Sequence, residues 1–163
     1  MKLFTRPLSL LAIASMALFF ANCGSEGDSK KPEEIELGKL SKQWSIVSAD
    51  LGGTTRTADF TNFKLTLSGS FNSSSPAGPY DYDVSGNQPV LSPWPQAPDG
   101  SGGTWEFSGT PNTDSGLILR SDDVGMTYTI SNGQLTLQFT LDPDAGYPAK
   151  AAQVGGQWTF VFN

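Results

Sequence analysis

Short runs of alternating apolar and polar residues recur along the chain after residue 38, and this pattern limits the possible folds more than any other feature. The clearest case is residues 134–141, in which Leu135, Leu137, Phe139 and Leu141 fall on one side and polar residues on the other. A period of two is typical of a strand with one buried face, and no window shows sustained helical periodicity. We therefore predict that residues 39–163 form one all-β domain.

Eight segments carry this alternation, and clusters of Gly, Ser, Asn, Asp and Pro separate them. The link Ser131-Asn132-Gly133 predicts a tight hairpin, because Asn and Gly tolerate the positive φ angles of such a turn. Successive antiparallel pairing gives either an eight-stranded up-and-down barrel or a β-sandwich, and we favour the barrel because closure removes exposed edges. The predicted strands are residues 43–48, 63–71, 80–84, 104–108, 117–121, 126–131, 134–141 and 157–162.

The long interruption of the pattern, residues 86–103, holds four prolines and one tryptophan, Trp94, which stands between Pro93 and Pro95. Repeated prolines cannot donate to a strand ladder, so this segment is predicted to be a loop. A loop tryptophan held in this way can stack on a sugar, cap the mouth of a pocket or fold back to plug the barrel. We take Trp94, with Tyr80 and Tyr82 of a predicted strand, as candidate ligand-binding residues; strand tyrosines are also typical of a purely structural role.

Residues 1–22 have the pattern of an export signal, because a start that contains Lys2 and Arg6 precedes an uncharged apolar run. That run, residues 8–20, is well short of the about 20 residues that a helix needs to cross hydrocarbon. The tetrad Phe-Ala-Asn-Cys, which ends at Cys23, resembles a bacterial lipobox, in which the cysteine becomes lipidated. Residues 23–38 are expected to form a flexible tether, in which residues 31–34 start one short helix.

Composition excludes several classes of function. The chain has no histidine, and its one cysteine, Cys23, is the expected lipid attachment site, so we expect no enzyme, no cofactor and no metal. Four of the five glutamates, Glu36 among them, fall in the expected tether, which leaves Glu106 alone in the domain. An aspartate-based hydrolase, with Asp81 and Asp83 on one strand face, is the catalytic alternative. The net charge of −6 disfavours nucleic acid as a partner, because phosphate recognition needs basic patches.

Three stretches, SPWPQAPDGSGGTWEFSG, MTYTISNGQLTLQFTL and GGQWTFVFN, resemble an uncharacterised group of lipocalin-like lipoproteins of Bacteroidota. The resemblance implies a barrel anchored to the outer membrane through Cys23, facing the periplasm or the cell surface, that binds a small apolar or amphipathic ligand. The alternative is a structural or interaction module of the cell envelope that binds protein or carbohydrate at the surface. Bulky residues predicted to point inward favour this alternative, because a barrel packed with them has no room for cargo: Phe63, Phe71, Phe107, Phe139, Trp158 and Phe160.

Overall fold

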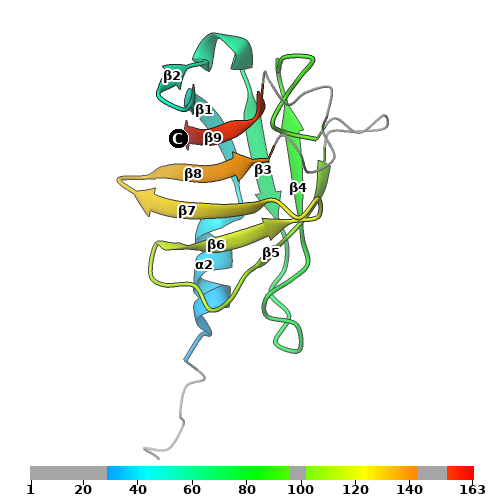
Figure 1. Cartoon of the computed structure of the whole chain (residues 1–163). Coiled ribbons are helices and arrows are strands. Elements are labelled where there is room, and N and C mark those ends of the chain that lie inside the picture. The colour runs from blue at the N-terminus through cyan, green and yellow to red at the C-terminus, as the bar shows by residue number, and fades with distance from the viewer. Residues whose placement is uncertain (1–28, 96–101, 143–153) are drawn as a thin grey trace, which may run out of the picture. The chain divides into compact units, whose positions relative to one another are not determined.

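Eight strands of the computed structural model close into an antiparallel barrel (Figure 1), in which each strand pairs with its neighbours in the chain and β1 pairs with β9. The structure describes residues 29–95, 102–142 and 154–163, and the chain from Lys31 to Asn163 forms one compact unit. The predicted up-and-down barrel is therefore confirmed, in place of the sandwich. The barrel strands are β1 (Gln43–Leu51), β3 (Lys64–Ser68), β4 (Tyr80–Ser85), β5 (Gly102–Phe107), β6 (Ser115–Arg120), β7 (Gly125–Ser131), β8 (Gln134–Leu141) and β9 (Gly156–Phe162).

The alternation in the sequence matches the two faces of the barrel wall. In β4 the side chains of Tyr80, Tyr82 and Val84 are buried, whereas Asp81 and Asp83 are exposed. The strands β8 and β9 pair over seven positions, from Leu135 opposite Phe162 to Leu141 opposite Gly156. A period-two pattern thus places every second side chain in a common interior, as a closed sheet requires.

Two local features shape the wall. The hairpin between β7 and β8 turns at Asn132 and Gly133, whose φ angles of 51° and 78° are those of the predicted tight turn. In β1 residues 43–45 pair with β3 and residues 46–51 pair with β9, and the register of the pairing with β9 shifts between Ile46 and Ser48. A bulge of this kind bends a strand and increases its twist, and here it lets β1 complete the ring.

Two smaller segments lie between β1 and β3. The two-residue strand β2 (Thr54–Thr55) pairs with the end of β1, and the 3₁₀ helix η1 (Thr57–Phe60) follows it. Phe60 of η1 is buried, and its ring meets those of Phe63, Trp158 and Phe160 at centroid distances of 5.1–5.9 Å. The connection therefore contributes to the core at this end of the barrel.

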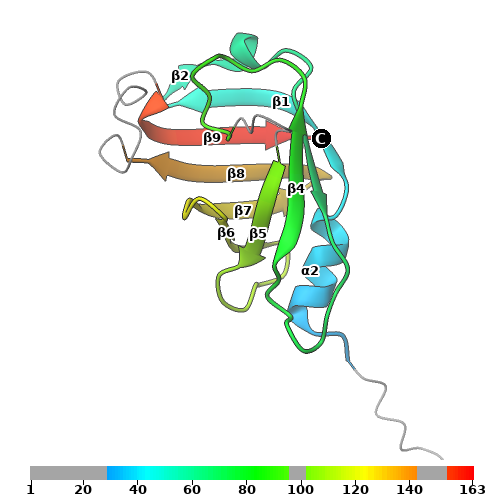
Figure 2. The same ribbon diagram turned by 90° about the vertical axis from the view of Figure 1, so that its right-hand side faces the viewer.

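The helix α2 (Pro32–Leu40) packs at the other end, away from β2 and η1 (Figure 2). Its sequence favours a helix, because Pro32 stands at the start, acids occupy the first turn and Lys39 occupies the last turn. Leu37 and Leu40 join the core, and the Trp44 Nε1 donates to the carbonyl oxygen of Leu40 at 2.9 Å. The short helix expected to start at residues 31–34 is confirmed, but the structure differs from the expected tether because residues 32–38 are packed rather than free. Cys23 and the expected signal peptide lie outside the described residues.

In the part of the chain that the structure describes, no helix has the length and apolar character needed to cross a membrane.

Candidate functional site

Trp94 occupies the interior of the barrel at the end opposite α2. The segment from Gly86 to Pro95 follows β4, forms no strand and brings the Trp94 side chain to an exposed fraction of 1%. The indole lies among four core rings, with centroid distances of 5.5–6.4 Å. Of the three roles open to this tryptophan from the sequence, the structure places it as a plug. The surrounding rings are those of Phe63, Tyr82, Phe139 and Phe160.

The other two candidate residues, Tyr80 and Tyr82, point into the same interior and are buried. Tyr82 contacts the Trp94 ring at a centroid distance of 6.4 Å, whereas Tyr80 packs against Trp105 at 5.0 Å. The Tyr80 hydroxyl donates to the carbonyl oxygen of Pro76 at 2.7 Å, and burial raises the pKa of this hydroxyl. The structure therefore brings Tyr82 and Trp94 together and gives Tyr80 a separate place in the wall.

A buried arginine completes the Trp94 site. Arg120, the last residue of β6, points inward with an exposed fraction of 2%. Its Nε and Nη2 donate to the two carboxylate oxygens of Asp122 at 2.9 and 2.5 Å, and its Nη1 donates to the carbonyl oxygen of Pro93 at 3.1 Å. The guanidinium carbon lies 5.1 Å from the centroid of the Trp94 ring and 5.6 Å from that of Phe139. Both distances are in the range of cation–π attraction.

Sequence reasoning missed Arg120, although a signal was present. In the predicted strand 117–121 the alternation puts Arg120 on the same face as Ile118, and Asp122 follows directly as a counter-charge. Burial of Asp122 acts to raise the pKa of its carboxyl, but the hydrogen bonds and the positive charge of Arg120 outweigh this effect and hold the pKa below its ordinary value. The Asp122 carboxyl is therefore ionised near neutral pH and places a negative charge beside the buried guanidinium.

The Trp94 indole N–H is buried, and within the part of the chain that the structure describes it has no hydrogen-bond partner. The backbone of the same residue is held, because the Trp94 N–H donates to the Ser92 Oγ at 3.1 Å and that hydroxyl donates to Gln88 at 2.8 Å. Most buried donors in proteins find an acceptor, and each exception calls for an explanation. The plug thus combines a well-packed ring with one unsatisfied polar group.

Aromatic packing fills the rest of this end of the interior. Phe160 stacks on Phe139 at 5.9 Å and on Phe162 at 6.0 Å, and its ring also lies 5.4 Å from that of Trp158. Of the six residues expected to point inward, Phe63 and Phe71 lie outside β3; Phe63 is buried, and Phe71 packs partly buried against the core. The barrel therefore encloses its own side chains, and Trp94 is a large ring that a loop contributes to this interior.

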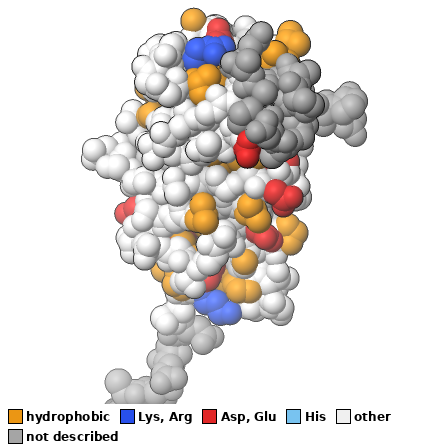
Figure 3. All heavy atoms as spheres, viewed as in Figure 1, with side chains coloured by type: hydrophobic (Ala, Val, Ile, Leu, Met, Phe, Trp, Pro, Cys, Tyr) orange, Lys and Arg blue, Asp and Glu red, His pale blue; other side chains and the backbone are white. Residues whose placement is uncertain are grey.

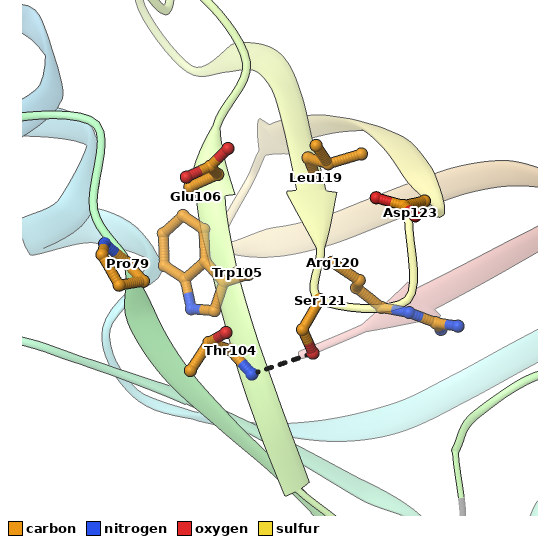
Figure 4. Close-up of a pocket in the computed structure, with 8 residues that line it drawn as sticks. All are labelled: Pro79, Thr104, Trp105, Glu106, Leu119, Arg120, Ser121 and Asp123. Carbon is orange, nitrogen blue, oxygen red and sulfur yellow. Dashed lines mark hydrogen bonds between the residues drawn. The ribbon is translucent and has the colours of Figure 1, made fainter.

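One hollow of about 200 Å³ opens on the outer wall between β5 and β6 (Figure 4). Thr104, Glu106, Ser121 and Asp123 give it a polar lining, and the Thr104 N–H donates to the Ser121 Oγ at 3.3 Å. In Figure 4 the Arg120 side chain extends away from Glu106 and Trp105. The hollow therefore opens on the outer surface, and Arg120, whose guanidinium contacts Trp94, also contributes to its lining.

A second buried polar cluster ties α2 to the barrel. The carboxylate of Glu36, with an exposed fraction of 1%, accepts hydrogen bonds from Lys39 Nζ at 2.6 Å, the Asp114 N–H at 3.1 Å and the Tyr128 hydroxyl at 3.2 Å. Burial raises the pKa of Tyr128, and the negative charge of Glu36 raises it further. Hydrogen bonds to Asp114 and Glu36 raise the pKa of the Lys39 ammonium group. Glu36, expected in the tether, is thus part of the closed end of the barrel.

Among the described residues, no three acidic or cysteine side chains gather in a group that could hold a metal ion. A scan against protein-family models, a search of curated proteins and a search of solved structures find no match for this chain.

Proposed function

We propose that this protein is a lipid-anchored, non-catalytic barrel of the bacterial envelope that binds a small amphipathic ligand in the space now held by Trp94. The observation that carries the proposal is that the ring that fills this space belongs to a loop rather than to the wall; its buried N–H, moreover, has no partner among the described residues. A loop can leave the interior without breaking the strand ladder. Trp94 is then a plug that a ligand displaces.

The energy of this exchange is moderate. Burial of a tryptophan ring stabilises a domain by about 3–5 kcal/mol. The unsatisfied indole N–H offsets about 1–3 kcal/mol of that, because it regains a partner in water once the loop opens. The hydrogen bond from Arg120 to the Pro93 carbonyl oxygen and the cation–π contact with the Trp94 ring also stabilise the closed state. A ligand therefore has to supply equivalent contacts in order to displace the plug.

Anchoring is the second part of the proposal, and it rests on the lipobox-like tetrad that ends at Cys23 and on the resemblance to lipocalin-like lipoproteins of Bacteroidota. These features support a location at the outer membrane, facing the periplasm or the cell surface. Replacement of Cys23 by alanine should move the protein from the membrane fraction to the soluble fraction. Retention of the Cys23→Ala protein in washed membranes would contradict lipid anchoring.

Native mass spectrometry of the full-length mature protein, purified gently from its own host, tests ligand binding. We expect an added mass of a few hundred daltons that denaturation releases, at low occupancy in the wild type and at higher occupancy in Trp94→Ala. Val90→Ala is the matched control, because Val90 lies in the same loop with an exposed fraction of 86% and does not plug the barrel. If all three proteins are folded and each shows only its own polypeptide mass, with no added mass, the proposal is overturned.

That outcome would favour the alternative function, an interaction module that acts through its outer surface. The specific observation behind it is the wall formed by β7, β8 and β9, whose outward side chains are uncharged although the chain is acidic (Figure 3). A wall of hydroxyl and amide groups suits contact with a protein or a carbohydrate, since no charge has to be removed from water. These outward residues include Thr127, Thr129, Gln134, Thr136, Gln138, Thr140, Gln157 and Thr159.

A further inference from the structure

We propose that the site takes a neutral, planar aromatic compound that carries a carbonyl-type hydrogen-bond acceptor, and that Arg120 is the residue that selects it. The inference rests on the proposed function, because such a ligand must take the place of Trp94. It goes further in naming the chemical class of the ligand and the group that recognises it.

The contacts between the loop and Arg120 indicate which groups a ligand must supply. Two adjacent residues serve one guanidinium group: the Pro93 carbonyl oxygen accepts from Nη1 at 3.1 Å, and the Trp94 ring lies 5.1 Å from the guanidinium carbon. A ligand that displaces both residues has to replace both interactions. Otherwise a buried N–H loses its acceptor and the face of the guanidinium loses its ring, and each loss weakens binding. An aromatic ring with a nearby carbonyl meets both demands.

The charges at the site favour a neutral ligand. Asp122 already binds the Nε and Nη2 of Arg120 through both carboxylate oxygens, so the guanidinium carries its counter-charge. An anionic ligand would compete with Asp122 and would approach a hollow that Asp122, Asp123 and Asp142 line together. A cationic ligand would meet the buried guanidinium directly. Charge of either sign is therefore opposed in a place where little water screens it.

The walls of the site favour a flat ring. Phe63, Tyr82, Phe139 and Phe160 surround the indole with interplanar angles of 39°, 59°, 73° and 74°. The guanidinium of Arg120 offers a further planar surface, on which aromatic rings stack. A saturated ring or a branched chain would lose these edge and face contacts.

Three small probes with related rings separate these demands. N-acetyltryptophanamide is neutral and carries amide carbonyls, N-acetyltryptophan replaces one amide by a carboxylate, and 3-methylindole keeps the ring without an acceptor. Binding to the mature wild-type protein and to Trp94→Ala is measured by calorimetry. We expect N-acetyltryptophanamide to bind Trp94→Ala at least about tenfold more tightly than the wild type, because the plug no longer competes. We also expect N-acetyltryptophanamide to bind Trp94→Ala about tenfold more tightly than either of the other two probes does.

Arg120→Lys in the Trp94→Ala background tests the recognising group, because lysine keeps the charge but lacks the planar fork. We expect the preference for N-acetyltryptophanamide over 3-methylindole to disappear in this double variant. Where Trp94→Ala does not fold, Trp94→Leu replaces it, since leucine keeps most of the apolar volume and still frees the space above Arg120.

The outcomes are distinct. Equal affinity for 3-methylindole would overturn the role of the acceptor, and equal affinity for N-acetyltryptophan would overturn the requirement for a neutral ligand. No binding of any probe to a folded Trp94 variant would overturn the inference as a whole. If the variant shows the expected preference and the wild type binds no probe, the chemistry of the site is supported and the proposed function fails, because the plug then does not open.

Discussion

Replacement of Leu37 by alanine tests whether residues 32–40 are a packed part of the domain. Leu37 lies on the inner face of α2 with an exposed fraction of 3%, whereas Ile35 of the same helix is 45% exposed. Replacement of a buried leucine by alanine lowers the free energy of unfolding by about 2–5 kcal/mol. The lower half of this range applies here, because a helix at the end of a barrel can shift and partly close the cavity. We therefore expect Leu37→Ala to cost about 2–3 kcal/mol.

Thermal and urea unfolding of the mature protein, followed by tryptophan fluorescence, measure this cost. For a domain of this size about 2–3 kcal/mol lowers Tm by roughly 6–18 °C. The matched control is Ile35→Ala, which removes an aliphatic side chain from the other face of α2 and should cost well under 1 kcal/mol. A flexible tether would make both substitutions neutral, so equal unfolding midpoints for Leu37→Ala and Ile35→Ala would refute the packing of α2.

Three further predictions concern pH and backbone geometry. The arginine partner lowers the pKa of Asp122, so above roughly pH 4 the substitution Asp122→Asn should lower the free energy of unfolding by about 1–3 kcal/mol. Urea titrations of the wild type and the variant should show that this difference shrinks as the pH falls below that value. Because the pKa of Tyr128 is higher in the folded state than in the unfolded state, the wild type should lose stability relative to Tyr128→Phe above about pH 10, by up to about 1.4 kcal/mol per pH unit. If the two proteins keep a constant difference in the free energy of unfolding up to about pH 11, this prediction is wrong. Gly86→Ala should prevent folding, as judged by circular dichroism, because its Cβ would lie 2.1 Å from a backbone carbonyl oxygen, whereas Gly133→Ala, with open space around it, should cost only about 1 kcal/mol.

The wall of the barrel could be predicted from the sequence because each strand has its own alternation of apolar and polar residues. Alternation places Leu135, Leu137 and Phe139 on one face of β8 whatever its neighbours are, and Asn132-Gly133 defines the hairpin that precedes it. Period-two burial and turn preferences are local properties, since they depend on residues within a few positions of one another. Because strands that follow one another in the chain tend to pair, and because a closed sheet has no exposed edges, few strand topologies remained.

The candidate site was only partly visible for the opposite reason. Trp94 and Tyr82 could be named as unusual aromatics, but the contact between them joins a loop to a strand twelve residues earlier, and no local pattern indicates which way a loop ring turns. Arg120 lay on the same strand face as Ile118, yet a buried guanidinium is tolerable only because Asp122 and the Pro93 carbonyl are in place to receive it. The Pro93 carbonyl, 27 positions earlier in the chain, is a partner that is known only once the chain has folded.

The same distinction explains α2. Its sequence is polar and short, and short helices are marginal by themselves, so residues 23–38 had the composition of a tether. The helix forms because Leu37 enters the core and because Glu36 reaches the Tyr128 hydroxyl, 92 positions later in the chain. The sequence by itself thus determined the strands, their order and the hairpin. Only the tertiary structure decided what closes each end of the barrel, because burial of Trp94, Arg120 and Glu36 is stabilised by partners that are distant along the chain.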